Sequence, residues 1–338
     1  MIALSMRSDN ARDLALVEVP MPEPGTDEVR IEVAAAGICG SDVSAALAKP
    51  NFDWVRRPRI LGHELSGVVD AAGAAVRGLE PGSRVTAVSV QGCGGCSYCR
   101  AGHTQLCGER TILGMSSDGA MASYCVVKAE HVVPLDEGLS HLQGALVEPL
   151  AVSARCMYNC CEVRAGDRVV VSGCGIIGLL CALVARARGA EVAITGIDAD
   201  REVRLQMARA LGFTTIVVSD HTPLVAQLDA PADILVEASG APGALAAAPA
   251  AVARCGLIGV VATYPSEVAI SATDLVRCEQ RLHTSFGSTK ADYRTAMAHL
   301  AAGDIPVDQL VETFPLTEAL AALDASIEKR TPKAVIVP

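Results

Sequence analysis

The chain has 338 residues, of which 51% are hydrophobic and 20% are charged, and its formal net charge is -10 at pH 7. This length accommodates two domains with separate cores, and the apolar composition excludes an intrinsically disordered chain. The acidic balance gives nucleic acid and anionic membrane surfaces no general electrostatic attraction, so we expect neither as a partner.

The sequence predicts neither a secretion signal nor a membrane segment. Residues 1–16 carry scattered charges and lack the apolar run of a signal peptide. The longest uncharged run, residues 169–185, is shorter than the ~18–20 residues that a membrane-spanning helix needs. We therefore expect a cytoplasmic protein.

Residues 28–129 show a strand-rich pattern. Apolar and polar residues alternate over residues 29–33 and more loosely over residues 84–88, and Gly–Pro pairs separate the short apolar segments. This pattern predicts a compact, partly open β-barrel.

Four cysteines follow the pattern C-x2-C-x2-C-x7-C in a glycine-rich stretch: Cys93, Cys96, Cys99 and Cys107. Two-residue gaps let successive thiolates turn toward one point, and four sulfurs at ~2.3 Å complete the tetrahedral shell of a zinc ion. A closed shell is typical of a structural zinc. An iron–sulfur cluster is the competing interpretation, which the long last gap and the lack of a proline after Cys107 disfavour. Loop cysteines without a metal are the other alternative.

The pattern changes near residue 139, where helical periodicity begins and then alternates with short apolar runs. The expected strands are 168–172, 192–194, 215–218, 234–236 and 257–261, and the expected helices are 144–161, 176–188, 200–211 and 243–252. Alternating strands and helices predict βαβ units and a doubly wound parallel sheet. The fold class is therefore α/β plus β.

A second group of metal donors is spread along the chain: Cys39, His63, Glu64 and Glu148. Glu148 lies in an otherwise apolar segment, where an unpaired carboxylate is costly and a cation would stabilise it. A thiolate, an imidazole and a carboxylate leave one zinc position open for water or substrate, which is the catalytic arrangement. The alternative is that His63 hydrogen-bonds in a core turn while Glu148 caps a helix.

The sequence G-x-G-x-x-G follows an expected strand directly and opens an expected helix. Such a loop lets the backbone approach a pyrophosphate at the helix N-terminus, and an acidic residue about 20 positions on binds the adenosine ribose. The candidate cofactor-binding residues are Gly173, Gly175, Ile176, Ile177, Gly178 and Asp198. Asp198 favours NAD, whereas Arg201 or Arg204 can serve NADP instead; a glycine turn without a ligand is the third possibility.

The last segment is expected to form helices at 291–302 and 317–329 and a strand at 334–337. Periodicity alone does not assign this segment to either domain.

These motifs together resemble the zinc-containing medium-chain alcohol dehydrogenase family over nearly the whole chain, and especially its polyol, sorbitol and sugar-acid dehydrogenase branch. The resemblance is carried by residues 39–42 (CGSD), 62–64 (GHE) and 148–152 (EPLAV). It implies a GroES-like barrel domain over 1–145, to which 290–338 return, and a Rossmann domain over 146–289. It also implies two zinc ions per subunit and a homodimer or homotetramer.

By this resemblance, the protein transfers a hydride between a secondary alcohol and NAD or NADP. Cys39, His63 and either Glu64 or Glu148 bind the catalytic zinc, and the resemblance does not order the two glutamates. Ser41 matches the hydroxyl that relays the proton, and Asp42 matches the carboxylate that orients the metal-bound histidine. The chain departs from the family at position 44, where a serine replaces the histidine of many members, so the outer end of the relay is not assigned.

The substrate class stays broad: a polyol, sugar acid, sugar phosphate or cyclitol. Three arginines between the first two metal donors, Arg56, Arg57 and Arg59, can meet an anionic substrate or be solvated surface charges. One alternative function is the oxidation of an amino alcohol, as in threonine dehydrogenases. Another is a zinc- and cofactor-binding protein without turnover.

Overall fold

The computed structural model describes all of residues 1–338, which divide into two compact units. Unit 1 comprises Met1–Ala151 and Gly287–Pro338, and unit 2 comprises Val152–Phe286. The boundary expected after residue 145 precedes the first division by six residues, and the return expected at residue 290 follows Gly287 by three. The assignment of the two units as catalytic and cofactor domains stays a prediction.

The main sheet of unit 1 has seven strands in the order β10-β6-β5-β3-β18-β17, with β9 also paired to β3. Its strands are β3 (Glu28–Gly37), β5 (Glu64–Ala72), β6 (Arg84–Ala87), β9 (Tyr124–Lys128), β10 (Val132–Pro134), β17 (Val311–Pro315) and β18 (Lys333–Val337). Because Val335 of β18 pairs with Gly37 of β3, the last segment of the chain completes the sheet that begins near residue 28.

Smaller elements complete unit 1. The short strands are β1 (Ile2–Met6), β2 (Leu14–Glu18), β4 (Arg59–Ile60), β7 (Val90–Gln91) and β8 (Thr111–Ile112). The helices are α1 (Gly40–Ala46), α2 (Ser97–Arg100), α8 (Lys290–Ala302), α9 (Val307–Leu310) and α10 (Ala319–Ile327). Helix α3 (His141–Arg155) runs across the division between the units and continues as a π-helical turn, Cys156–Cys160.

The alternation expected over residues 29–33 is confirmed in β3. Val29, Ile31 and Val33 are buried in a core that β5, β6 and β9 share, while the intervening residues are more exposed. Burying such a side chain contributes about 1.5–3 kcal/mol, so this pattern also sets which face of β3 packs inward.

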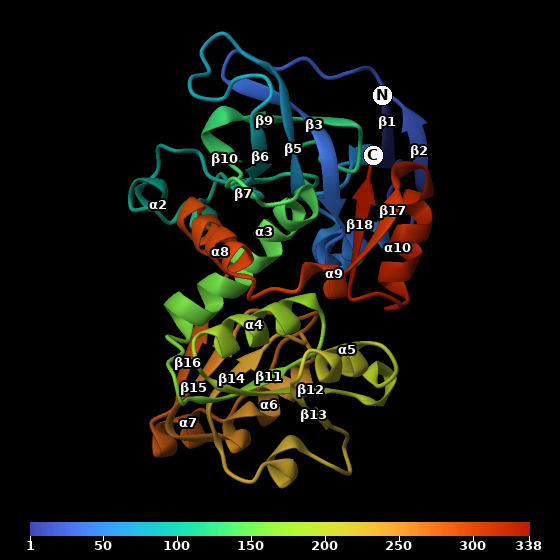
Figure 1. The fold of residues 1–338 in the computed structure, drawn as a ribbon. Coiled ribbons are helices and arrows are strands. Elements are labelled where there is room, and N and C mark those ends of the chain that lie inside the picture. Colours follow the sequence, from blue (N-terminus) through green and yellow to red (C-terminus); the bar gives the residue numbers. More distant parts are fainter. The chain divides into compact units, whose positions relative to one another are not determined.

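Unit 2 contains the predicted doubly wound sheet, with six parallel strands in the order β13-β12-β11-β14-β15-β16. The strands are β11 (Arg168–Ser172), β12 (Glu191–Gly196), β13 (Thr214–Val217), β14 (Ala232–Glu237), β15 (Val252–Val260) and β16 (Arg281–Thr284). The helices are α4 (Ile176–Ala187), α5 (Arg204–Ala210), α6 (Pro242–Ala251) and α7 (Ala272–Cys278). In Figure 1, α4 and α5 cover one side of this sheet and α6 and α7 lie on the other.

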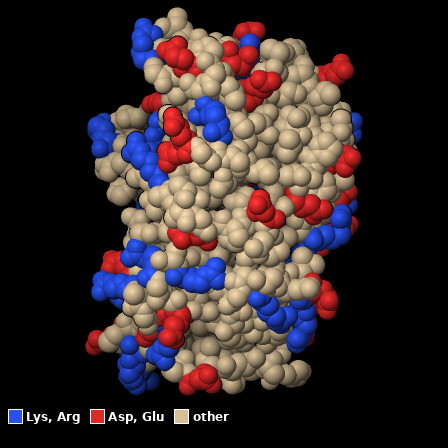
Figure 2. Space-filling view, in the orientation of Figure 1, with Lys and Arg blue, Asp and Glu red and all other residues tan.

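None of the helices combines the length and the apolar character needed to cross a lipid bilayer. On the face shown in Figure 2, acidic and basic side chains are interspersed and form no broad basic area. This distribution agrees with the net charge of -10.

Candidate active site and metal centres

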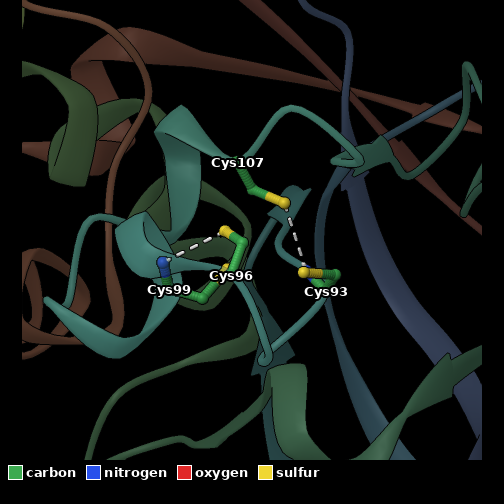
Figure 3. A group of neighbouring side chains, drawn as sticks. All are labelled: Cys93, Cys96, Cys99 and Cys107. Atoms are coloured by element: carbon green, nitrogen blue, oxygen red, sulfur yellow. Dashed lines mark hydrogen bonds between the residues drawn. The ribbon is translucent and has the colours of Figure 1, made fainter.

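The four cysteines of the C-x2-C-x2-C-x7-C pattern converge in unit 1, in and around the short helix α2 (Figure 3). Their Sγ atoms all lie within 4.8 Å of one another. Tetrahedral coordination with ~2.3 Å zinc–sulfur bonds places sulfurs about 3.8 Å apart, so the group fits a zinc ion after small adjustments. All four ligand positions would be sulfur, which leaves no open position.

Backbone amides favour the thiolate form that a metal requires at two of these cysteines, Cys93 and Cys96. The N–H groups of Gly95 and Cys96 lower the pKa of Cys93 to about 7. The amide of Cys99 also donates to Cys96 Sγ at 3.4 Å. Gly92 is required here because a Cβ at this position would lie 2.7 Å from Cys99 Sγ. The glycine-rich sequence around the cysteines therefore serves close packing of backbone and sulfur.

The structure also brings together Cys39, His63 and Glu64, whose donor atoms lie within 4.8 Å of one another in unit 1. Cys39 caps the N-terminus of α1, and Glu64 begins β5. The side chains of His63 and Glu64 are nearly inaccessible to solvent, and the buried Oε1 of Glu64 has no hydrogen-bond partner. A half-buried thiolate, a buried imidazole and a buried carboxylate with an unsatisfied oxygen suit a divalent cation.

Two neighbouring side chains match the roles that the resemblance implies. Asp42 is fully buried, accepts a hydrogen bond from the Cys39 amide at 2.8 Å, and places its other oxygen 3.5 Å from His63 Nδ1. Burial opposes protonation of His63, but the charges of Asp42 and Cys39 outweigh it and raise the pKa of His63. The Oγ of Ser41 lies 3.4 Å from His63 Nε2, on the opposite side of the ring from Asp42.

A buried lysine that the sequence analysis did not single out contacts this site. Lys333, at the start of β18, is 2% exposed, pairs with the Glu64 carboxylate and donates to the Ile38 carbonyl at 2.9 Å. Gly37 faces Glu64 across the β3–β5 pair, and a Cβ on Gly37 would overlap both Glu64 and Lys333. The ion pair therefore depends on a glycine at the end of β3.

Glu148 lies outside the Cys39–His63–Glu64 group. Its Oε1 accepts a hydrogen bond from Ser89 Oγ at 2.6 Å, and the Ser89 amide donates to the hydroxyl of Tyr293 at 3.2 Å. The Tyr293 hydroxyl in turn donates to the Ala87 carbonyl at 2.9 Å. Burial raises the pKa of Glu148, while His63 acts in the opposite direction. Ser89 thus holds the Glu148 carboxylate, and Tyr293 holds the backbone around Ser89.

Lys333, Ser89 and Tyr293 carry no motif, so sequence reasoning missed them. The one available signal was Lys333 itself, because a lysine directly before the apolar strand 334–337 needs a partner if that strand is buried.

Two of the three arginines between Cys39 and His63 already have carboxylate partners. Arg57 is nearly buried and lies 3.1 Å from Asp9, and Arg59 lies 2.9 Å from Asp118. Only Arg56 is exposed. These contacts weaken the expectation that all three arginines meet an anionic substrate.

In unit 2, the G-x-G-x-x-G loop joins β11 to α4. Gly173 has a positive φ of 108°, and a Cβ on Gly178 would overlap the Gly173 carbonyl oxygen, so both positions require glycine. Gly175 caps α4 without a side-chain hydrogen bond to the first turn, which begins at Ile176 and Ile177. The amides of this turn are therefore free of side-chain caps and suit a phosphate.

Asp198 lies two residues beyond the end of β12 and is 73% exposed in its side chain. It accepts a hydrogen bond from Arg201 Nε at 2.7 Å, and Asp200 lies 3.8 Å from Arg204. Both arginines that could have served a 2′-phosphate are thus paired with aspartates of their own segment.

Comparison with known proteins gives two family matches. Residues 25–137 match the family described as alcohol dehydrogenase GroES-like domain, and residues 177–302 match the family described as zinc-binding dehydrogenase. Together, the two matched ranges include residues of both units.

Curated proteins and solved structures resemble the chain over most of its length. D-Arabitol-phosphate dehydrogenase of Enterococcus avium is 31% identical, over 99% of this chain and 97% of its own. L-Threonine 3-dehydrogenase of Bacillus subtilis is 34% identical, over 80% of this chain and 79% of its own. The crystal structure of a zinc-binding dehydrogenase of Sinorhizobium meliloti bound to NADP superposes with a TM-score of 0.89 at 28% identity, covering 100% of this chain and 99% of that one.

Proposed function

Because the chain belongs to the zinc-binding alcohol dehydrogenase family, we propose that it oxidises a secondary alcohol of a polyol or sugar derivative with NAD as hydride acceptor. The observation that carries this proposal is that the donor atoms of Cys39, His63 and Glu64 lie within 4.8 Å of one another, with His63 and Glu64 buried. The predicted family, fold class and oxidoreductase activity are confirmed by the family matches.

The ligand assignments are part of the proposal. Cys39, His63 and Glu64 hold the catalytic zinc, and Glu148 is a nearby carboxylate that can exchange with Glu64 as a ligand. When bound, zinc polarises a hydroxyl oxygen and the dinucleotide accepts the hydride. Asp42 orients the His63 ring through Nδ1, which leaves Nε2 for the metal.

Ser41 receives the proton of the substrate hydroxyl in this proposal. Its Oγ lies beside His63 Nε2, so a hydroxyl bound at the metal position is within reach of Ser41. Lys333 holds the Glu64 carboxylate in place through their buried ion pair, because a buried carboxylate without a cation would be costly.

Cys93, Cys96, Cys99 and Cys107 hold the second, structural zinc in the proposal. Their all-sulfur composition and their position on adjacent turns support a closed site that stabilises the loop around α2.

The glycine loop and Asp198 bind the dinucleotide in the proposal, with the uncapped first turn of α4 on the pyrophosphate. NAD is favoured over NADP because the exposed Asp198 carboxylate, just beyond β12, can accept the adenosine ribose hydroxyls. The NADP-bound relative keeps NADP as the alternative cofactor.

The substrate class rests on the relatives. D-Arabitol-phosphate dehydrogenase supports a polyol or a polyol phosphate, and the proposal includes sugar acids and cyclitols. With Arg57 and Arg59 paired, Arg56 is the arginine of this segment that remains for an anionic group. The L-threonine 3-dehydrogenase relative favours amino-alcohol oxidation as the second candidate function.

We also propose a homodimer or homotetramer in the cytoplasm. Strand β16 ends its sheet, all four of its residues are exposed, and Leu282 and Phe286 are 39% and 42% exposed. A second copy can pair with such an edge, and light scattering after size exclusion would show a monomer if the idea is wrong. Thirteen cysteines, five of them proposed as zinc ligands, suit a reducing compartment.

The test of function combines metal analysis with a substrate panel. Purified protein is expected to contain two zinc ions per chain, to lose turnover with a chelator and to regain it with zinc. The panel contains polyols, polyol phosphates, sugar acids, cyclitols and L-threonine, each with NAD and NADP, followed by nicotinamide absorbance. Turnover confined to L-threonine would select the second function, and cofactor binding without turnover of any alcohol would contradict both.

A further inference from the structure

A second buried carboxylate, unrelated to the metal donors, lies in unit 2. Glu237 ends β14 and is fully buried. It accepts hydrogen bonds from the Ser239 amide at 3.0 Å and the Gly240 amide at 3.2 Å, and from the hydroxyls of Ser239 and Tyr264. None of these donors is a cation; backbone amides and hydroxyl groups occupy both carboxylate oxygens of Glu237.

Glu237 lies beside the glycine loop. In the parallel sheet it is paired with Ser172, the residue directly before Gly173. A Cβ on Gly173 would lie 2.8 Å from the Ser239 amide nitrogen, so residues 239–240 pack directly against the first glycine of the loop. The hydrogen bonds of Glu237 therefore fix the segment that supports this glycine.

Tyr264 connects a third segment to the same carboxylate. It follows β15, is half-buried, and donates its hydroxyl to Glu237. Burial and the Glu237 carboxylate raise the pKa of Tyr264, so the phenol keeps its proton and remains a donor. Gly240 lies against the Thr263 carbonyl, since a Cβ there would approach that oxygen to 2.8 Å. The Glu237 carboxylate thus holds together the segments around residues 239 and 263.

We propose that Tyr264 and Glu237 form a positioning pair for the dinucleotide. The pair holds Ser239 and Gly240 against Gly173, and so keeps the glycine loop in the conformation that presents the first turn of α4 to a pyrophosphate. This inference rests on the proposed function, because it requires that the glycine loop binds a dinucleotide. Neither residue contacts the reacting atoms in this role.

The test uses Tyr264→Phe in the full-length, zinc-loaded protein, with Tyr124→Phe in β9 of unit 1 as the matched control. NADH binding is measured by fluorescence titration. We expect the Kd of Tyr264→Phe to rise about tenfold, as for loss of one hydrogen bond to a charged group, and the control to stay within twofold. The zinc content is expected to stay unchanged, and kcat at saturating NAD to change less than KM for NAD.

Hydrogen exchange provides a readout without cofactor. In the wild-type protein, the Ser239 and Gly240 amides are expected to exchange slowly because Glu237 accepts from both, and Tyr264→Phe is expected to accelerate them about tenfold. Fast exchange of both amides in the wild-type protein would overturn the proposal, even if the variant failed to fold. An unchanged Kd in a folded variant would also overturn it. A wild-type protein that binds neither NADH nor NADPH would instead overturn the proposed function.

Discussion

The two groups of metal donors in unit 1 are built in different ways. The four cysteines come from fifteen consecutive positions on loops around α2, where the pKa of Cys93 is lowered by local backbone amides. Cys39, His63 and Glu64 come from the ends of β3, α1 and β5, and depend on Lys333 from the last strand. Local spacing brings the first group together, whereas the second exists only when β3, β5 and β18 are correctly paired.

We expect the group formed by Cys39, His63 and Glu64 to be the one required for catalysis. Cys39→Ala is expected to lower kcat by at least about 1000-fold and the zinc content from two to one, because the thiolate ligand is lost. NADH binding should persist. Turnover and metal content of Cys255→Ala, an exposed cysteine of unit 2, give the control. Retained activity in Cys39→Ala would contradict the ligand assignment.

The four-cysteine group is expected to cross-link the loop around α2 and to stabilise that loop alone. Cys99→Ser should also remove one zinc, and trypsin should then cleave after Arg100 or Arg110 at least about tenfold faster, because the loop loses its cross-link. Turnover should fall less than tenfold. A loss of both zinc ions and of all activity would show that the two groups depend on each other.

The dependence of the second group on β18 is tested with Lys333→Met. In protein stripped of zinc with a chelator, this change leaves Glu64 buried without a cation, and the free energy of unfolding is expected to fall by about 3 kcal/mol. Urea denaturation monitored by circular dichroism measures it, with Lys333→Arg as the charge-preserving control. A loss below about 1 kcal/mol would mean that the ion pair does not hold the site together.

The smallest effect on stability is expected from a change of Tyr293, whose hydroxyl accepts a hydrogen bond from the Ser89 amide. Tyr293→Phe removes the hydroxyl that bonds the Ala87 carbonyl and the Ser89 amide, at a cost of about 1–2 kcal/mol in unfolding free energy. If Ser89 also positions Glu148, KM for the alcohol should rise while Kd for NADH stays constant. An unchanged KM would limit Tyr293 to a structural role.

Much of the fold followed from local patterns. The strand at 168–172, the helix after it and the parallel sheet were predicted, because each βαβ step is visible in a short window of sequence. Helix α1 was missed: it has only seven residues, and it begins where Asp42 satisfies the Cys39 amide. Strand β17 was missed because its residues are mostly exposed and show no apolar alternation.

In the candidate site, too, local motifs were predictable and long-range contacts were not. The cysteine spacing and the glycine loop were recognisable because their residues are close in sequence. Lys333 and Tyr293 were not, since they reach Ile38 and Ser89 across 295 and 204 positions of chain. Sequence also left Glu64 and Glu148 unordered; the structure groups Glu64 with Cys39 and His63, and the identity of the third ligand stays a proposal.

The insertion of β18 between β3 and β17 has a consequence for the order of events during synthesis. All six strands of unit 2 leave the ribosome before Lys333 does, so that sheet can form on the nascent chain. Strand β3 is made early but receives its last neighbour only when residues 335–336 emerge. The metal-donor sheet is therefore completed last, and until then its open edge and an uncompensated Glu64 are exposed to chaperones and proteases.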